Sequence, residues 1–167
     1  MFVRLSREED KEIIEQLLES SFGNRNHFGA LDNLLGRYLL AFIDDKLVAM
    51  TGLYYIEDYK HFEIDWTCTH PSYRGRGIMH ELFNRICNLT DEPIYCSCWR
   101  EPNKDVINLH SLMVAFNFKE VMKPRVTWDS RYNCDCGKTG FCVAQKRENE
   151  TRQPCRCYED LWVRETL

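Results

Sequence analysis

The segment Thr67–Met79 reads TCTHPSYRGRGIM and decides the fold class of this chain. Its first residues are typical of a strand, two glycines and two arginines follow, and an apolar helix begins directly after them. Glycine allows a sharp turn and the close approach of a ligand, and the first N–H groups of a helix have no partner within it. Together with the positive end of the helix dipole, these groups form a main-chain cradle for an anion such as a diphosphate. A solvated turn is the alternative, and neither the dinucleotide G-x-G-x-x-G pattern nor a P-loop lysine is present.

Hydrophobic periodicity predicts the elements on both sides of this segment. Ser6 and Glu9 have the spacing of a capping box at the start of the first helix. The expected strands cover residues 2–5, 38–43, 47–56, 62–69, 94–99, 119–128 and 158–164, and the expected helices cover residues 6–22, 28–35, 78–87 and 106–116. This order predicts an α/β fold with a mixed sheet, not a doubly wound parallel one.

Length and composition narrow the class of protein. With 167 residues and 44% hydrophobic residues, the chain fits one domain over residues 1–167, with a Cys-rich insert at about 129–157 between the last two strands. No apolar run approaches the roughly 18 residues of a membrane span, and we expect no membrane partner. The net charge of −4 argues against nucleic acid as the main partner. The acidic start of the chain resembles no targeting signal, so we expect a cytoplasmic protein.

The segment Pro71–Ile78 resembles the acyl-CoA signature of the GNAT N-acetyltransferases. Arg74 and Gly77 match that signature, whereas Met79 replaces the small residue that usually ends it. The stretch Ala115–Val121 is similar to the helix-to-strand junction of the same family. The resemblance covers about residues 2–128 and 158–165.

The resemblance implies a mixed sheet of six to seven strands, splayed between the fourth and fifth strands, with helices on both faces. It also implies an enzyme that moves an acetyl group from acetyl-CoA, its co-substrate, to a primary amine by direct attack in a ternary complex. The acyl-CoA-binding residues that it implies are Thr67, Cys68, Thr69, Arg74, Gly75, Arg76, Gly77, Ile78, Met79 and Asn108.

Two carboxylates are the candidate catalytic groups. Glu63 and Asp65 share one face of a strand because side chains alternate with a period of two. Glu63 lies eleven residues before Arg74, where the resemblance places a catalytic base, and Asp65 is the second candidate. The alternative is that these acids only line an acceptor pocket or face solvent. The general acid is unassigned, because Met113 occupies the position of the family's tyrosine.

Nine cysteines are the unusual feature of the composition. A structural zinc, disulfides and unlinked thiols are the alternatives for the five in the insert, which are Cys134, Cys136, Cys142, Cys155 and Cys157. Cys87 lies on the apolar stripe of its helix and is expected in the core. The strand residues Cys68, Cys96 and Cys98 are either core residues or carriers in a covalent acyl transfer.

Two functions of different kinds follow from these patterns. The first is the N-acetyltransferase, with a small-molecule or peptide amine as acceptor. The second is a non-catalytic acyl-CoA-binding or protein-interaction module with a metal-stapled cysteine arm. The sequence does not define the acceptor or the oligomeric state, although a dimer is compatible with it.

Overall fold

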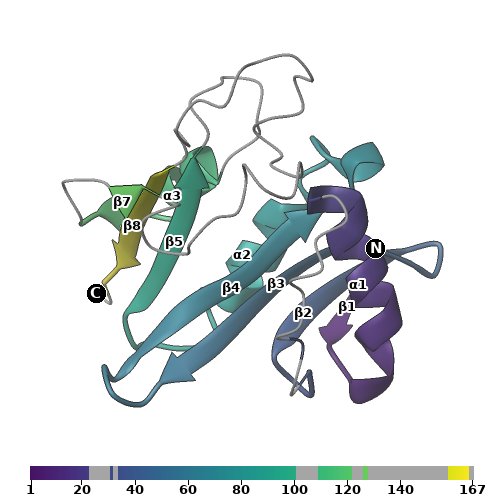
Figure 1. Cartoon of the computed structure of the whole chain (residues 1–167), viewed down its shortest axis with the longest axis horizontal. Helices are drawn as coiled ribbons and strands as arrows, with labels where there is room; N and C mark the ends of the chain where they lie inside the picture. The colour runs from purple at the N-terminus through teal and green to yellow at the C-terminus, as the bar shows by residue number, and fades with distance from the viewer. Residues whose placement is uncertain (23–30, 32–33, 101–108, 122–125, 128–157, 166–167) are drawn as a thin grey trace. The chain divides into compact units, whose positions relative to one another are not determined.

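The computed structural model describes residues 1–22, 31, 34–100, 109–121, 126–127 and 158–165 (Figure 1). The chain divides into two compact units, residues 1–94 and residues 95–165. The prediction of one domain over residues 1–167 concerns how these units sit together and stays a prediction. Within the described part of the chain, no helix is both long and apolar enough to cross a membrane.

The first unit is built on an antiparallel sheet. Its strands lie in the order β1-β2-β3-β4 and have the bounds Phe2–Leu5, Tyr38–Ile43, Lys46–Ile56 and His61–Thr69. The turn between β2 and β3 places Asp44 and Asp45 at φ of 49° and 59°. Two consecutive residues with positive φ are typical of the tight hairpin turn whose twist matches that of the strands. The predicted hairpin is confirmed.

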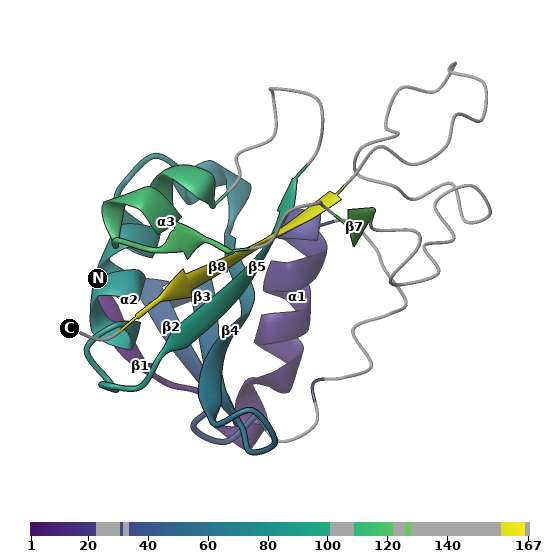
Figure 2. The same ribbon diagram turned by 90° about the vertical axis from the view of Figure 1, so that its left-hand side faces the viewer.

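Helices cover both faces of this sheet. A short 3-10 turn η1 (Glu8–Asp10) leads into α1 (Lys11–Phe22), and a second turn η2 (Pro71–Tyr73) precedes α2 (Ile78–Ile86). Figure 2 shows α1 and α2 on opposite faces of the β1–β4 sheet. Each helix buries an apolar stripe, and each fully buried Leu or Ile contributes about 2 kcal/mol. The stripes are Ile14, Leu17 and Leu18 of α1, and Ile78, Leu82, Phe83 and Ile86 of α2.

The start of the first helix differs from the prediction. Ser6 is buried, with 1% of its surface exposed, and its hydroxyl accepts a hydrogen bond from the main-chain N–H of Tyr38 at 3.0 Å. It therefore ties the strand β2 to the chain before the helix, and the Ser6–Glu9 capping box is wrong. The Asp10 carboxylate caps the turn instead, because it accepts the main-chain N–H of Arg7 at 2.7 Å.

The described residues of the second unit form one helix and four strands. The elements are β5 (Ile94–Arg100), α3 (His110–Ala115), β6 (Lys119–Glu120), β7 (Val126–Thr127) and β8 (Tyr158–Arg164). In the sheet, β8 lies between β5 and β6, and it pairs antiparallel with both β6 and β7. The strand predicted over residues 119–128 is therefore present as two short strands on β8. The predicted helix at 28–35, the start of the helix at 106–116 and the insert at 129–157 fall mainly or wholly outside the described residues.

Candidate active site

The glycine loop connects the end of β4 to the start of α2. Gly75 and Gly77 both have positive φ, at 73° and 76°, and Gly77 caps the helix. A Cβ built on either glycine meets no heavy atom within 4 Å. Glycine is needed here because of the backbone conformation and not because of crowding.

The main-chain N–H groups of this loop are available to a ligand. Within the described residues, none of the N–H groups of Gly75–Met79 has a hydrogen-bond acceptor. Two arginines hold the loop by bonding back to main-chain oxygens, since Arg74 Nε donates to Thr69 O and Arg76 Nη2 donates to Ser72 O, both at 3.1 Å. Successive free N–H groups at the start of a helix fit an anion such as a diphosphate.

The fourth strand is distorted next to this loop. Met50 pairs with Cys68 and Gly52 pairs with Asp65, so β4 has one more residue than β3 between the two pairs. Such a bulge bends a strand and changes the direction of its side chains. Thr67 lies in the bulge, where its hydroxyl donates to the main-chain oxygen of Asp65 at 2.8 Å.

Other residues of the predicted acyl-CoA site have structural roles. Cys68 belongs to the core cluster packed against α1, and burial raises the pKa of its thiol to about 12. A thiol with that pKa is protonated at neutral pH, which argues against Cys68 as an acyl carrier. Cys96 and Cys87 are buried too. Ile78 is buried and anchors α2, whereas Asn108 and the side chain of Cys98 lie outside the described residues.

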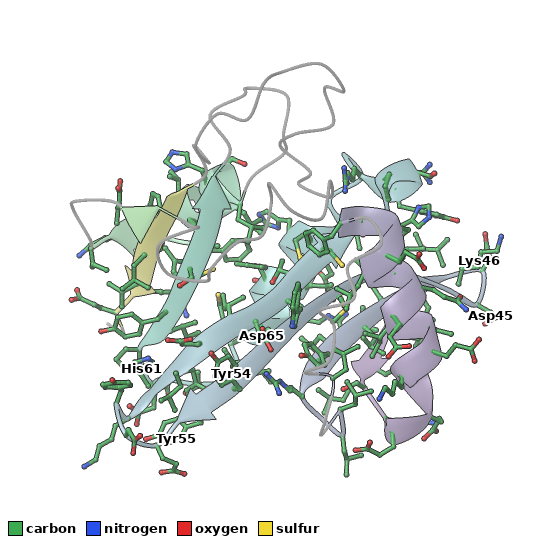
Figure 3. The ribbon with its side chains drawn as sticks, in the orientation of Figure 1. Asp45, Lys46, Tyr54, Tyr55, His61 and Asp65 are labelled. Carbon is green, nitrogen blue, oxygen red and sulfur yellow. The ribbon has the colours of Figure 1, made fainter. Side chains whose placement is uncertain are left out.

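A group of polar side chains, here called the polar stripe, lies on strands β2 to β4 and just before β2. Its members are Arg37, Tyr38, Tyr54, His61, Glu63 and Asp65. Figure 3 shows Tyr54, His61 and Asp65 along the neighbouring strands β3 and β4. The stripe contains both predicted catalytic carboxylates.

Asp65 is engaged by two donors. Arg37 Nη2 lies 2.5 Å from its Oδ2, and the hydroxyl of Tyr38 donates to the same oxygen at 3.0 Å. The side chains of Arg37 and Asp65 are 28% and 21% exposed. The Asp65 carboxylate is thus paired with a guanidinium in a partly buried position, and its Oδ2 already has two donors.

In the described part of the chain, Glu63 is held by a tyrosine and a histidine instead of a guanidinium. The hydroxyl of Tyr54 donates to its Oε2 at 2.5 Å, and His61 Nε2 lies 3.4 Å from Oε1. The Glu63 side chain is 31% exposed, so a bound molecule can reach it. Burial raises the pKa of Tyr54 and of Tyr38 well above the usual value near 10, so both phenols stay protonated and act as donors.

The sequence pattern indicates the two carboxylates but not their partners. Tyr54 pairs with Glu63 across the strands, and this register is set by the β3–β4 turn. The alternation of polar and apolar residues over His61–Asp65 was the available signal for His61. No comparable local pattern marks Arg37 or Tyr38.

The general acid and the metal site are not found in the described part of the chain. Met113 is fully buried in α3 and has no proton to donate. The five cysteines of the predicted zinc site all lie within residues 128–157, outside the described residues, so the zinc stays a prediction. Among the residues that the structure does describe, no cluster of three or more His, Cys, Asp or Glu could hold a metal ion.

A glycine loop with free N–H groups between an antiparallel strand and a helix is the architecture of the acyl-CoA N-acyltransferase class. The chain belongs to the acetyltransferase (GNAT) family, whose sequence model matches residues 3–113. This confirms the predicted family. No curated protein matches the chain.

Solved structures show the same fold. The N-acetylglutamate synthase of Neisseria gonorrhoeae, complexed with coenzyme A and N-acetyl-glutamate, has a TM-score of 0.62 and 13% identity over 99% of this chain. This chain covers 35% of that synthase, about a third of its length. Arabidopsis thaliana Naa50, in complex with the bisubstrate analogue CoA-Ac-MVNAL, has a TM-score of 0.64 and 17% identity over 96% of each chain.

A third structure is the ribosomal-protein-S18-alanine N-acetyltransferase of Escherichia coli, with a TM-score of 0.66 and 9% identity over 97% of this chain and 91% of that one. At such identities the likeness shows the fold alone. The α/β class and the GNAT fold are therefore confirmed, whereas the splay between the fourth and fifth strands stays a prediction.

Proposed function

We propose that the protein transfers an acetyl group from acetyl-CoA to a primary amine, by direct attack in a ternary complex. Family membership supports an acetyltransferase, and the free N–H groups of the glycine loop are the observation that carries the proposal. Two of the neighbouring structures contain coenzyme A or an analogue joined to it, which supports the same co-substrate.

The loop Arg74–Met79 fits the diphosphate of acetyl-CoA. Its N–H groups are unpartnered among the described residues, and Gly75 and Gly77 carry no side chain that would block a phosphate. The start of α2 adds partial positive charge. When bound, acetyl-CoA supplies the activated acetyl thioester.

Glu63 is the proposed base. An alkylamine has a pKa near 10.4, so at pH 7 nearly all of it is protonated and cannot attack a carbonyl. Glu63 removes this proton directly or through one water. Its carboxylate is partly exposed and faces a neutral phenol, whereas that of Asp65 is paired with Arg37. Asp65 is therefore the second candidate, as the sequence pattern predicts.

A variant at Glu63 tests this assignment. General base catalysis contributes roughly 100-fold to 10,000-fold, and we expect Glu63→Gln to lower kcat by at least 100-fold at pH 7. The matched control is Glu57→Gln in the exposed β3–β4 turn, which should keep the wild-type rate. Unchanged turnover of Glu63→Gln across the pH range would remove Glu63 from the mechanism.

The acceptor is a small-molecule or peptide amine. The neighbours' names include an amino acid, a pentapeptide and a protein alanine, so they do not select one class. The panel for this chain should therefore contain spermidine, L-lysine, L-glutamate and a peptide with a free N-terminus.

A non-catalytic acyl-CoA-binding module is the second candidate. It is favoured by Met113, because a buried methionine stands where the family carries a proton-donating tyrosine. A rise in the unfolding temperature with acetyl-CoA, without thiol release on any amine, would support this second candidate. Thiol release that depends on an amine would support the enzyme.

A further inference from the structure

Tyr54 and Glu63 form a cross-strand pair. They lie directly opposite each other in the register of β3 and β4, and the phenol hydroxyl is 2.5 Å from Glu63 Oε2. A glutamate side chain has several rotatable bonds, and a short hydrogen bond to one of its oxygens restricts them. The other oxygen, Oε1, is then held in a defined direction.

The guanidinium of Arg37 also contacts the ring of Tyr54. The guanidinium carbon of Arg37 lies 5.2 Å from the centroid of the Tyr54 ring and 5.5 Å from that of Tyr38. A guanidinium over an aromatic face is attracted by the ring. Arg37 is in turn fixed by Asp65, which also accepts the hydroxyl of Tyr38.

The two carboxylates of the stripe thus have different surroundings. Asp65 has a guanidinium and a phenol on one oxygen. Among the residues that the structure describes, Glu63 has a phenol on Oε2 and the more distant His61 at Oε1. Paired carboxylates in unlike environments are suited to unlike tasks. Asp65 therefore holds its neighbours in place, and Glu63 keeps Oε1 for the proposed proton transfer.

We propose that Tyr54 is a positioning residue for Glu63, and that the Arg37–Asp65 ion pair holds the Tyr54 ring in place. This inference rests on the proposed function, in which Glu63 is the base. The proton of the acceptor ammonium passes to Glu63 Oε1, where an O–H bond forms as the N–H bond breaks. Tyr54 keeps its own proton throughout, and Asp65 accepts none.

The first test is Tyr54→Phe, which keeps the ring beside Arg37 and removes the hydroxyl. With the amine that gives the highest rate in the panel, we expect kcat to fall about tenfold, the strength of one hydrogen bond to a charged group, with KM for acetyl-CoA unchanged. The matched control is Tyr55→Phe. Tyr55 is the next residue, its ring packs 5.0 Å from that of Phe62, and its variant should keep wild-type kinetics.

The split between kcat and KM separates positioning from simple stabilisation. Among the described residues, the polar groups around Glu63 are Tyr54 from β3, His61 and Asp65 from its own strand, Tyr38 from β2 and Arg37 just before β2. A misplaced base slows the chemical step and leaves the binding of the amine as it was. We therefore expect Tyr54→Phe to lower kcat with the KM of the amine unchanged. A loss of kcat/KM carried by KM alone would contradict the proposal.

A double-mutant cycle gives the second test. If Tyr54 acts through Glu63, adding Tyr54→Phe to Glu63→Gln should cause no further loss of kcat. Arg37→Lys keeps a cation beside Asp65 but loses the planar guanidinium that lies over the Tyr54 ring. It should therefore also lower kcat in the wild-type background and not in the Glu63→Gln background. An equal loss in both backgrounds would mean that Tyr54 is merely structural, and would overturn the proposal.

A crystal structure of Tyr54→Phe tests the positioning without any activity. We expect the Glu63 carboxylate to leave its wild-type position or to occupy several rotamers. A Glu63 unchanged in place would overturn the positioning role, even if the protein is an active acetyltransferase. A displaced Glu63 in a protein that acetylates no amine would instead keep the positioning role and reject the proposed function.

Discussion

At the scale of single residues, strand propensity and packing predict opposite effects of Gly52→Ala on stability. Alanine is usually preferred to glycine within a strand, which alone would make Gly52→Ala stabilising. A Cβ at this position would lie 2.6 Å from the ring of buried Tyr38 and 3.2 Å from the Cβ of Asp65. Overpacking of this kind costs about 1–3 kcal/mol, so we expect Gly52→Ala to lower the unfolding temperature. A higher unfolding temperature in calorimetry would contradict this packing.

Asp10 gives the protein an acid-dependent stability. Two hydrogen bonds from Arg4, at 2.6 and 2.7 Å, and the N–H of Arg7 hold the pKa of its buried carboxyl below the usual value. A carboxyl whose pKa is lowered on folding stabilises the fold above about pH 4. This stabilisation is lost as the pH falls through the pKa of the folded state. We expect Asp10→Asn to lose about 2 kcal/mol at pH 7 and less at pH 2.

Urea unfolding at the two pH values measures this difference. The control is Glu9→Gln, because Glu9 is exposed and its ion pair with Arg7 is 3.6 Å long at the surface. An Asp10→Asn variant with equal losses at both pH values would show that the ion pair is not the cause.

In the candidate site, the two carboxylates could be predicted from the sequence and their hydrogen-bond partners could not. Glu63 and Asp65 could be placed on one face, because the alternation of side chains along a strand is local. Their partners could not be found this way. Tyr54 meets Glu63 only through the strand register, and Arg37 meets Asp65 across 28 positions of the chain.

At the scale of elements, the glycine loop gives a matched comparison. Gly77 and Gly36 both have positive φ, at 76° and 69°, and neither has a heavy atom within 4 Å of a built Cβ. Alanine at either position should cost about 1–2 kcal/mol of backbone strain. Only Gly77→Ala also places a methyl group at the proposed diphosphate site. We expect it to weaken acetyl-CoA binding about tenfold in calorimetry, and Gly36→Ala to leave binding unchanged. Equal affinities would contradict the placement of the co-substrate.

Hydrophobic periodicity predicted the positions of most elements, whereas the residue that caps the first helix could not be predicted from spacing. The strands β2, β3, β4 and β5 and the helix α2 lie within a residue or so of their predicted bounds, because their apolar patterns are strong. The capping box failed because Ser6 has the right spacing but is buried against Tyr38. A spacing rule carries no information about tertiary burial.

At the scale of the whole molecule, the five cysteines of the predicted insert are the feature that family membership does not explain. The five cysteines at 134–157 lie outside the described residues, and the zinc prediction rests on their number and spacing alone. We expect freshly purified, reduced full-length protein to contain about one zinc per chain by mass spectrometry. Metal at trace level only would reject a structural zinc. The rest of the chain was predictable as a GNAT fold because the glycine loop is specific, whereas acceptor choice depends on loops and was not.

Amine-dependent thiol release from acetyl-CoA is the most direct measurement of the central claim. The purified protein is incubated with acetyl-CoA and the amine panel, free thiol is measured, and the amines are analysed by mass spectrometry. We predict that at least one amine gains an acetyl group in an amount equal to the thiol released. Stabilisation of the protein by acetyl-CoA, with no thiol released and no amine acetylated, would contradict the account.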